Sequence, residues 1–188
     1  MSRKLMMWAA LATLTAGFFI QQASAQEEAY TAMLQTKGTP GAGGSQVQFT
    51  VRITKWVTQD EIKQLGVLLK EKGQNALLNE LKGRDAGRIN KTGDTGNQIA
   101  IAEKWKNGDQ TMITMISARR MTMFETKSRS QSTKYPFAFL QFTLNADGEG
   151  TGKLVESAAV KPDKEKETYK LDPFGQGARL VTNVKPVK

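Results

Sequence analysis

The chain has 188 residues, 27 Lys and Arg against 18 Asp and Glu, a net charge of +9, and neither cysteine nor histidine. Without those two residue types the chain cannot form disulfides, a Ser-His-Asp triad or the usual zinc sites. The length suits one domain with its own core. The positive charge would attract anionic partners, or it serves only to keep the surface soluble.

The N-terminus has the pattern of an export signal. Two basic residues precede the apolar run Leu5–Ile20, and Ala23-Ser24-Ala25 supplies the small residues that a signal peptidase requires. The run is shorter than the roughly 20 residues of a membrane-spanning helix. We therefore predict a signal peptide at 1–25, and a mature extracytoplasmic domain (periplasmic or secreted) at 26–188 with no transmembrane span. A retained membrane anchor is the alternative.

Two strands are predicted next, at Ala29–Gln35 and Gln46–Trp56. The second alternates apolar Val47, Phe49 and Val51 with polar residues, which is typical of a half-buried antiparallel strand. A Gly-rich segment connects the two strands.

A change of period then predicts helix. Thr58-Gln59-Asp60-Glu61 matches a capping box, and leucines follow at helical spacing. Gly73 is predicted to end this helix, and a second short helix is predicted at Asn75–Lys82. Together they would form a helical hairpin over about 58–82.

The remainder predicts more sheet. Asn107-Gly108 is a strong signal for a two-residue hairpin turn, which would place Lys106 opposite Asp109. Further strands are predicted at Asp85–Asn90, Gln98–Lys106, Asp109–Ala118, Arg119–Glu125, Tyr135–Asn145, Gly152–Val160, Thr168–Leu171 and Ala178–Val184. The expected fold class is α+β, mainly antiparallel β in a small barrel or sandwich, with one inserted helical hairpin.

The densest positive stretch is the candidate binding site. Arg119, Arg120, Lys127 and Arg129 could grip an anion, such as an anionic component of the cell envelope. The alternative interpretation is a solvated loop beside a basic edge strand. Export argues against genomic nucleic acid as a partner.

Two metal sites are weighed. Asn145 to Glu156 has the spacing of a calcium loop, although Gly148, Gly150 and Gly152 equally suit a tight hairpin. Four methionines offer thioethers for Cu(I), although methionine is also ordinary core filler: Met112, Met115, Met121 and Met123. The ordinary interpretation is favoured for both, and we predict no cofactor.

Several short motifs carry a resemblance: Leu77-Leu78, Gly87-Arg88-Ile89, Tyr135-Pro136-Phe137 and the glycine-rich turn at Asp147-Gly148. In these features the chain resembles a family of exported bacterial β-rich proteins that has no assigned activity. The resemblance implies no catalytic residues.

The expected function is a non-catalytic binding or structural role in the cell envelope or periplasm. One alternative is a carboxylate-dependent hydrolase or lyase, for which Glu103 and Asp172 are the least ordinary acids. The other is a barrel-type carrier of an apolar ligand, which would require a hollow interior.

Overall fold

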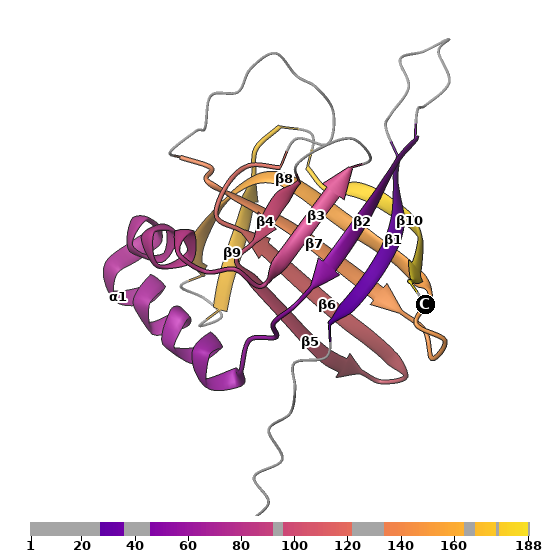
Figure 1. Cartoon of the computed structure of the whole chain (residues 1–188). Helices are drawn as coiled ribbons and strands as arrows, with labels where there is room; N and C mark the ends of the chain where they lie inside the picture. Colours follow the sequence, from indigo (N-terminus) through magenta and orange to yellow (C-terminus); the bar gives the residue numbers. More distant parts are fainter. Residues whose placement is uncertain are drawn as a thin grey trace, which may run out of the picture.

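Ten antiparallel strands form one sheet in the computed structural model, and a helix lies against its outside (Figure 1). The structure describes residues 27–35, 46–91, 96–121, 134–163, 168–175 and 177–187. The elements are β1 (Glu28–Gln35), β2 (Gln46–Ile53), α1 (Gln59–Lys82), β3 (Gly87–Lys91), β4 (Asn97–Ile99), β5 (Ile101–Asn107), β6 (Gln110–Ser117), β7 (Phe137–Leu144), β8 (Gly150–Asp163), β9 (Thr168–Pro173) and β10 (Arg179–Pro186).

The sheet curls into a nearly closed barrel. Its strand order is β4-β3-β2-β1-β10-β8-β7-β6-β5, so the two end strands are consecutive in the sequence and only Ala100 separates them. At this bend Ala86 N–H donates to Ile99 O on one side, and Ala100 N–H donates to Ile116 O on the other. One bent segment therefore joins both edges of the sheet. Of the two predicted architectures, the structure supports the barrel.

The barrel interior is filled by the inward-facing half of each strand. Phe49, Phe142, Met115 and Leu140 are at most 1% exposed. They belong to a core that also contains Tyr30, Ala32, Leu34, Val51, Ile53, Ala86, Ile89, Ile99, Ala102, Ile113, Met121, Ala138, Leu144, Leu154, Val181 and Val184. Such filling is expected for a barrel of about eight strands, in which interior side chains just meet.

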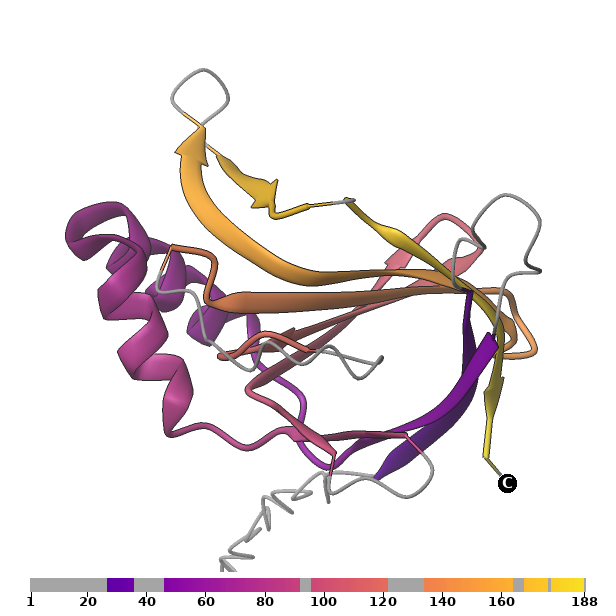
Figure 2. The same ribbon diagram turned by 90° about the horizontal axis from the view of Figure 1, so that it is seen from above.

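A second apolar cluster fixes α1 on the outside of the barrel. Buried leucines of the helix pack on outward-facing side chains of β5 to β8. The members from α1 are Leu65, Leu69, Leu77, Leu78 and Leu81, and those from the sheet side are Ala100, Ile101, Phe137 and Val160. Figure 2 shows α1 to one side of the barrel. The far half of β8, together with β9, curves away from the barrel (Figure 2).

The predicted helical hairpin is not confirmed, because the structure has one helix across both predicted segments. Gly73 adopts φ 77° and ψ −177°, which kinks α1, but the helix resumes without a connecting loop. The capping box at Thr58 is confirmed. In the described ranges, no helix has both the length and the apolar character needed to cross a membrane. The predicted signal peptide lies outside those ranges.

The predicted register of the β5–β6 hairpin is wrong by one residue on each strand. Lys106 faces Thr111, and Asn107 faces Gln110, so the two turn residues are Gly108 and Asp109. Gly108 has φ 60°, whereas Asn107 has no positive φ. A type II′ turn requires positive φ at its first central residue only, which explains why the glycine occupies that position.

The other predicted strands are confirmed within a few residues at their ends, with two exceptions. The single strand expected at Gln98–Lys106 is two strands, β4 and β5, because the chain bends at Ala100 and changes its pairing partner from β3 to β6. The second exception is the strand expected at Arg119–Glu125. Arg119, Arg120 and Met121 are not in a strand, and the rest of that range lies outside the described residues. Met121 N–H instead donates to Glu156 O on β8 at 3.0 Å. The segment after β6 therefore crosses an end of the barrel towards β8.

We expect Gly87→Ala to destabilise the barrel. Gly87 has φ 143°, and a Cβ there would meet the carbonyl group of Arg52 on β2. Overpacking of this kind typically costs about 1–3 kcal/mol, which would lower Tm by roughly 2–10 °C. Gly83→Ala is the matched control, since nothing lies within 4 Å of its added Cβ. Calorimetry showing equal Tm values for the two variants would contradict this account.

Candidate anion-binding site

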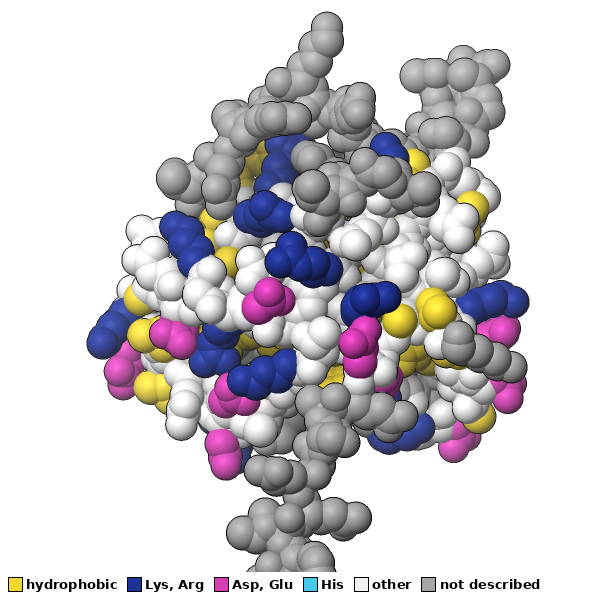
Figure 3. Space-filling view, in the orientation of Figure 1, with side chains coloured by type: hydrophobic (Ala, Val, Ile, Leu, Met, Phe, Trp, Pro, Cys, Tyr) yellow, Lys and Arg dark blue, Asp and Glu magenta, His cyan; other side chains and the backbone are white. Residues whose placement is uncertain are grey.

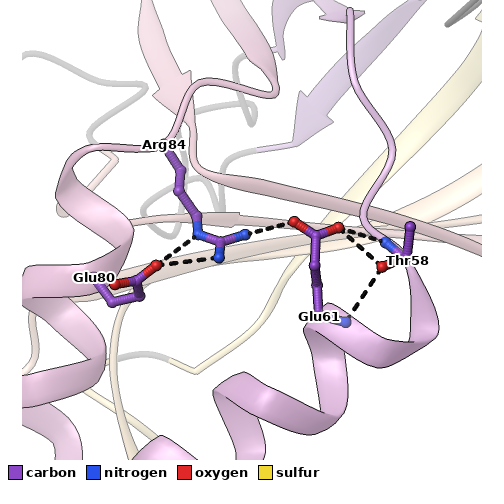
Figure 4. A network of polar contacts seen from close by, with 4 residues as sticks. All are labelled: Thr58, Glu61, Glu80 and Arg84. Carbon is purple, nitrogen blue, oxygen red and sulfur yellow. Dashed lines mark hydrogen bonds and ion pairs between the residues drawn. The ribbon is translucent and has the colours of Figure 1, made fainter.

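The C-terminus of α1 carries a basic pair, and ion pairs hold one member of it, Arg84, in place. Lys82 is the last helical residue, and Arg84 follows directly after the C-cap Gly83. The Arg84 guanidinium bridges two carboxylates of α1, with Nη1 at 3.2 Å from Glu61 Oε1 and Nη2 at 3.1 Å from Glu80 Oε1 (Figure 4). Arg84 therefore fixes the two ends of the helix relative to each other.

Glu61 also completes the N-terminal cap. Its Oε2 accepts from Thr58 N–H at 2.9 Å, while Glu61 N–H donates to Thr58 Oγ1 at 3.2 Å. The bond from the Thr58 backbone is the main cause that lowers the pKa of the Glu61 carboxyl, and Arg84 adds to it. Glu61 consequently stays ionised, and its charge offsets that of Arg84.

A cleft of about 190 Å³ lies between the end of α1 and the end of β6. Lys82, Arg84 and Arg119 line it together with Ser117 and Gln98. Gln98 Nε2 donates to Arg84 O at 2.9 Å, and Arg119 Nη2 donates to Gly96 O at 2.9 Å. Both bonds tie the rim of the cleft to the start of β4. Neither Lys82 nor Arg119 forms an ion pair within the described part of the chain.

Two polar atoms at and just after the end of β6 are buried without a hydrogen-bond partner among the described residues. They are Ser117 Oγ and Arg120 Nε. Ser117 is fully buried, and Arg120 is half-buried with no ion pair to a described residue. Buried donors normally have partners, because an unpaired polar group loses its hydration without compensation.

Two further clefts continue from this one along the outside of the barrel. A cleft of about 360 Å³ shares Arg84 and Ala100 with the first, and a groove of about 390 Å³ on the outer face of β2 and β3 shares Asp85 with the second. We call their six basic lining residues the basic band: Arg52, Lys55, Lys82, Arg84, Arg88 and Arg119.

The basic band has an excess of positive charge. Arg52 and Arg88 lie directly opposite each other on β2 and β3, an arrangement that repels unless counter-charges are near. Glu27 is 3.0 Å from Arg52, whereas Asp85 is 3.8 Å from Arg88. Figure 3 shows basic side chains gathered over the strands that face the viewer and beside α1. The arrangement is suited to holding anionic groups.

The structure brings only part of the sequence-predicted anion site to this place. Arg119 lines the cleft and Arg120 follows it, whereas Lys127 and Arg129 lie outside the described residues. Sequence reasoning missed Lys82 and Arg84, because the path of the chain around the barrel brings them next to Arg119. The Lys-Gly-Arg run at a helix end was the available signal.

The residues of the calcium hypothesis have other contacts in the structure. Asn145 Oδ1 accepts from the backbone of Asp147 and Glu149, which closes the β7–β8 turn. Glu156 lies well along β8, where it pairs with Arg179 at 3.4 Å. In the described part of the chain, no group of three acidic residues is placed to hold a metal.

The methionines of the copper hypothesis are spread across the barrel. Met115 and Met121 are fully buried in the core, which supports the core-filling interpretation. Met112 is half-buried opposite Trp105, and Met123 lies outside the described residues.

The two acids singled out for catalysis are not brought together. Glu103 accepts from Gln59 Nε2 at 3.1 Å, and Asp172 is 2.6 Å from Lys161 Nζ on the β8–β9 arm. Lys161 lowers the pKa of the Asp172 carboxyl. A general acid needs the opposite shift.

A polar cluster at the hairpin end of the barrel is satisfied internally. Lys104 Nζ is 2.7 and 2.9 Å from the two carboxylate oxygens of Glu28, and it lies 5.3 Å from the centre of the Trp56 ring. Tyr30 Oη donates to Glu28 Oε2 at 2.6 Å, and burial with this carboxylate raises the pKa of the phenol above its usual range. These groups need no ligand.

We expect the capping contacts of Glu61 to make stability depend on pH. The folded-state pKa of Glu61 is lowered, so its stabilising effect is present above the unfolded-state pKa of about 4.3 and is lost as pH falls through the folded-state value. Glu61→Gln should therefore lower Tm at pH 7 and much less near pH 3. Thr58→Ala should cost about 1 kcal/mol at pH 7.

Glu71→Gln is the control for this experiment, because Glu71 is an exposed residue of α1 with no ion pair among the described residues. Thermal melting across the pH range checks the prediction. A Tm difference between Glu61→Gln and the unmodified chain that does not change with pH would contradict it.

No family model matches the chain, and no curated protein or solved structure matches it either. We therefore infer function from the side chains and clefts of this chain itself.

Proposed function

We propose that the chain is a non-catalytic extracytoplasmic protein that binds anionic components of the cell envelope through the basic band. Three connected clefts on the outside of the barrel support this proposal. Three of their lining cations, Lys55, Lys82 and Arg119, have no carboxylate partner among the described residues. They are therefore available to an anionic ligand.

The filled barrel interior favours binding on the outside. Inward-facing side chains such as Phe49, Phe142 and Leu140 belong to a single buried apolar cluster. An apolar-ligand carrier would need space there. The external clefts are instead lined by charged and amide side chains, which recognise polar groups.

The basic band suits an extended anionic surface better than a neutral ligand. Its charges are spread over the outer face of β2 and β3, the end of α1 and the end of β6. Attraction between such a surface and the basic band would act over about one Debye length, which is about 8 Å at physiological ionic strength. Binding should therefore weaken steeply with salt.

The N-terminal pattern supports the location. A basic start, an apolar run and Ala23-Ser24-Ala25 are typical of a cleaved signal peptide. We expect the exported protein to begin at Gln26, which intact-mass spectrometry of the extracytoplasmic product would check. A product that retains Met1 and stays in the membrane fraction would contradict this expectation.

Vesicle sedimentation tests the binding proposal. The chain from Gln26 to Lys188 should sediment with phosphatidylcholine vesicles that contain phosphatidylglycerol, and not with pure phosphatidylcholine vesicles. The double variant Lys82→Glu/Arg119→Glu should lose most of this binding, because it reverses two unpaired charges of the basic band. Raising the salt concentration should have the same effect.

The matched control is Lys70→Glu/Lys153→Glu, which makes the same change in net charge. Lys70 is exposed on α1, and Lys153 is exposed on β8. Both lie outside the basic band. Equal loss in the two double variants would indicate general attraction by net charge, and equal binding to both vesicle types would indicate no role for charge. Either result would contradict the proposal.

A further inference from the structure

We infer that the free edge of β9 binds a second copy of this chain, so that two β9 strands pair antiparallel about a two-fold axis at Leu171. This inference is independent of the proposed function and concerns a different part of the fold. The far half of β8 and β9 form a two-stranded arm beyond the barrel, and β9 lies on the side of this arm away from α1 (Figure 2). In the described part of the chain, β9 pairs with β8 alone.

Two hydrogen bonds show which backbone groups of β9 face its free edge. Val160 N–H donates to Gln74 Oε1 on α1, so Val160 directs its backbone groups away from its β9 partner, Leu171. Phe174 N–H donates to Ser157 O, so Phe174 directs its N–H towards β8. Backbone groups alternate along an antiparallel strand, and both bonds fit the same alternation. The odd-numbered residues of β9, Leu171 among them, therefore direct their backbone groups to the free edge.

Charge selects one register for pairing with a second copy. An axis at Lys170 would place the two copies of Lys170 opposite each other, and an axis at Asp172 would do the same with Asp172, so both registers repel. An axis at Leu171 places Lys170 of each copy opposite Asp172 of the other, and it pairs all of β9 except Thr168. An axis nearer to either end of β9 would pair fewer residues. The axis at Leu171 is therefore the favoured one.

The free chain has a charge imbalance that this register removes. Lys161 and Lys170 lie directly opposite each other on β8 and β9, an arrangement that repels. Asp172 pairs with Lys161 at 2.6 Å, whereas Lys170 has no ion pair with a described residue. In the dimer, Asp172 of each copy would lie between Lys161 of its own chain and Lys170 of the other. A lysine on an edge strand normally deters pairing, and Asp172 makes this edge complementary to itself.

Exposed apolar side chains support the same axis. Leu171 is 41% exposed although it lies opposite the buried Val160, and Phe174, directly after β9, is 56% exposed. With the axis at Leu171, the two copies of this leucine would lie side by side on one face of a four-stranded sheet made of both arms. Two strands alone are marginally stable, and further strands with an apolar face stabilise them. Pairing would therefore bury Leu171 and stabilise the arm.

Sedimentation velocity tests for the dimer. The chain from Gln26 to Lys188 should change from monomer to dimer as its concentration rises from low micromolar to millimolar. A single monomeric species over this range would overturn the inference. Species that grow beyond a dimer would also overturn it, because pairing about a two-fold axis uses the same edge of both copies and closes.

Cysteine cross-linking tests the register, since the chain has no cysteine of its own. In the inferred register the two copies of Leu171 form a hydrogen-bonded pair with Cα atoms about 5.5 Å apart, which is within the range of a disulfide. Leu171→Cys should therefore form a covalent dimer under mild oxidation. Phe174→Cys is the control, because it places a thiol at an exposed position just after β9 and away from the axis. Equal cross-linking of the two variants would overturn the register.

Charge exchange tests the ion pairs across the axis. Lys170→Asp would place two carboxylates opposite each other in the dimer, whereas within one chain it would place an opposite charge across from Lys161. We therefore expect the dimer Kd to rise by at least about tenfold, while the Tm at low protein concentration does not fall. Lys170→Asp/Asp172→Lys should restore the dimer, because it recreates opposite charges across the axis.

Lys153→Asp is the matched control for this exchange. It makes the same change in net charge at an exposed position of β8, where that strand already pairs with β7 and β10. Its dimer Kd should equal that of the unmodified chain. Equal Kd values for Lys170→Asp and Lys153→Asp would overturn the inference, whether or not the double variant folds.

Discussion

The bend at Ala100 is the constraint on which the rest of the structure depends. In a regular strand Ile99 and Ile101 would share a face, but here Ile99 lies in the barrel core and Ile101 in the outer cluster beneath α1. The bend therefore lets one segment pair with β3 and then with β6, and it exchanges the inner and outer faces between the two pairings. Ala100 itself is buried and lines two clefts, so a larger side chain would fill the space on which both depend.

The position of α1 follows from that closure. Val57 N–H donates to Ala102 O just past the bend, which brings the start of the helix onto β5. The helix then covers outward-facing apolar side chains that would otherwise be exposed, and Gln74 Oε1 accepts from Val160 N–H where β7 no longer pairs with β8. The chain then runs from the end of α1 to β3, which pairs with β4. Arg84 lies on this connection and lines two of the clefts.

The sequence predicted local structure well and assembly poorly, for a physical reason. Alternation in β2 and β7 and the capping box at Thr58 are local signals, and the structure confirms them. The closure at Ala100 depends on an exchange of inner and outer faces within one segment, which a search for a single period along that segment does not report. The register of the β5–β6 hairpin was predicted wrongly because Asn107-Gly108 suits two turn types. The helical hairpin was predicted because Gly73 was expected to end the helix, whereas a glycine with positive φ can kink a helix without ending it.

At the candidate site Arg119 and Arg120 were visible as a charge cluster. Ser117 has the position of an inward-facing strand residue, and the sequence alone does not show that its hydroxyl lacks a partner among the described residues.

The two ends of the β5–β6 pair treat inward-facing polar groups differently. Near the hairpin turn, Lys104 reaches across the barrel to Glu28, and Lys106 Nζ donates to the buried Thr111 at 2.8 Å. Each of these groups has a partner within the fold, and the hydroxyl of Thr111, the one buried group among them, does not lose its hydration without compensation. At the other end, Ser117 Oγ and Arg120 Nε have no hydrogen-bond partner in the described part of the chain. A buried polar atom without a partner loses its hydration without compensation, so the fold gives up some stability at this end of the strand pair.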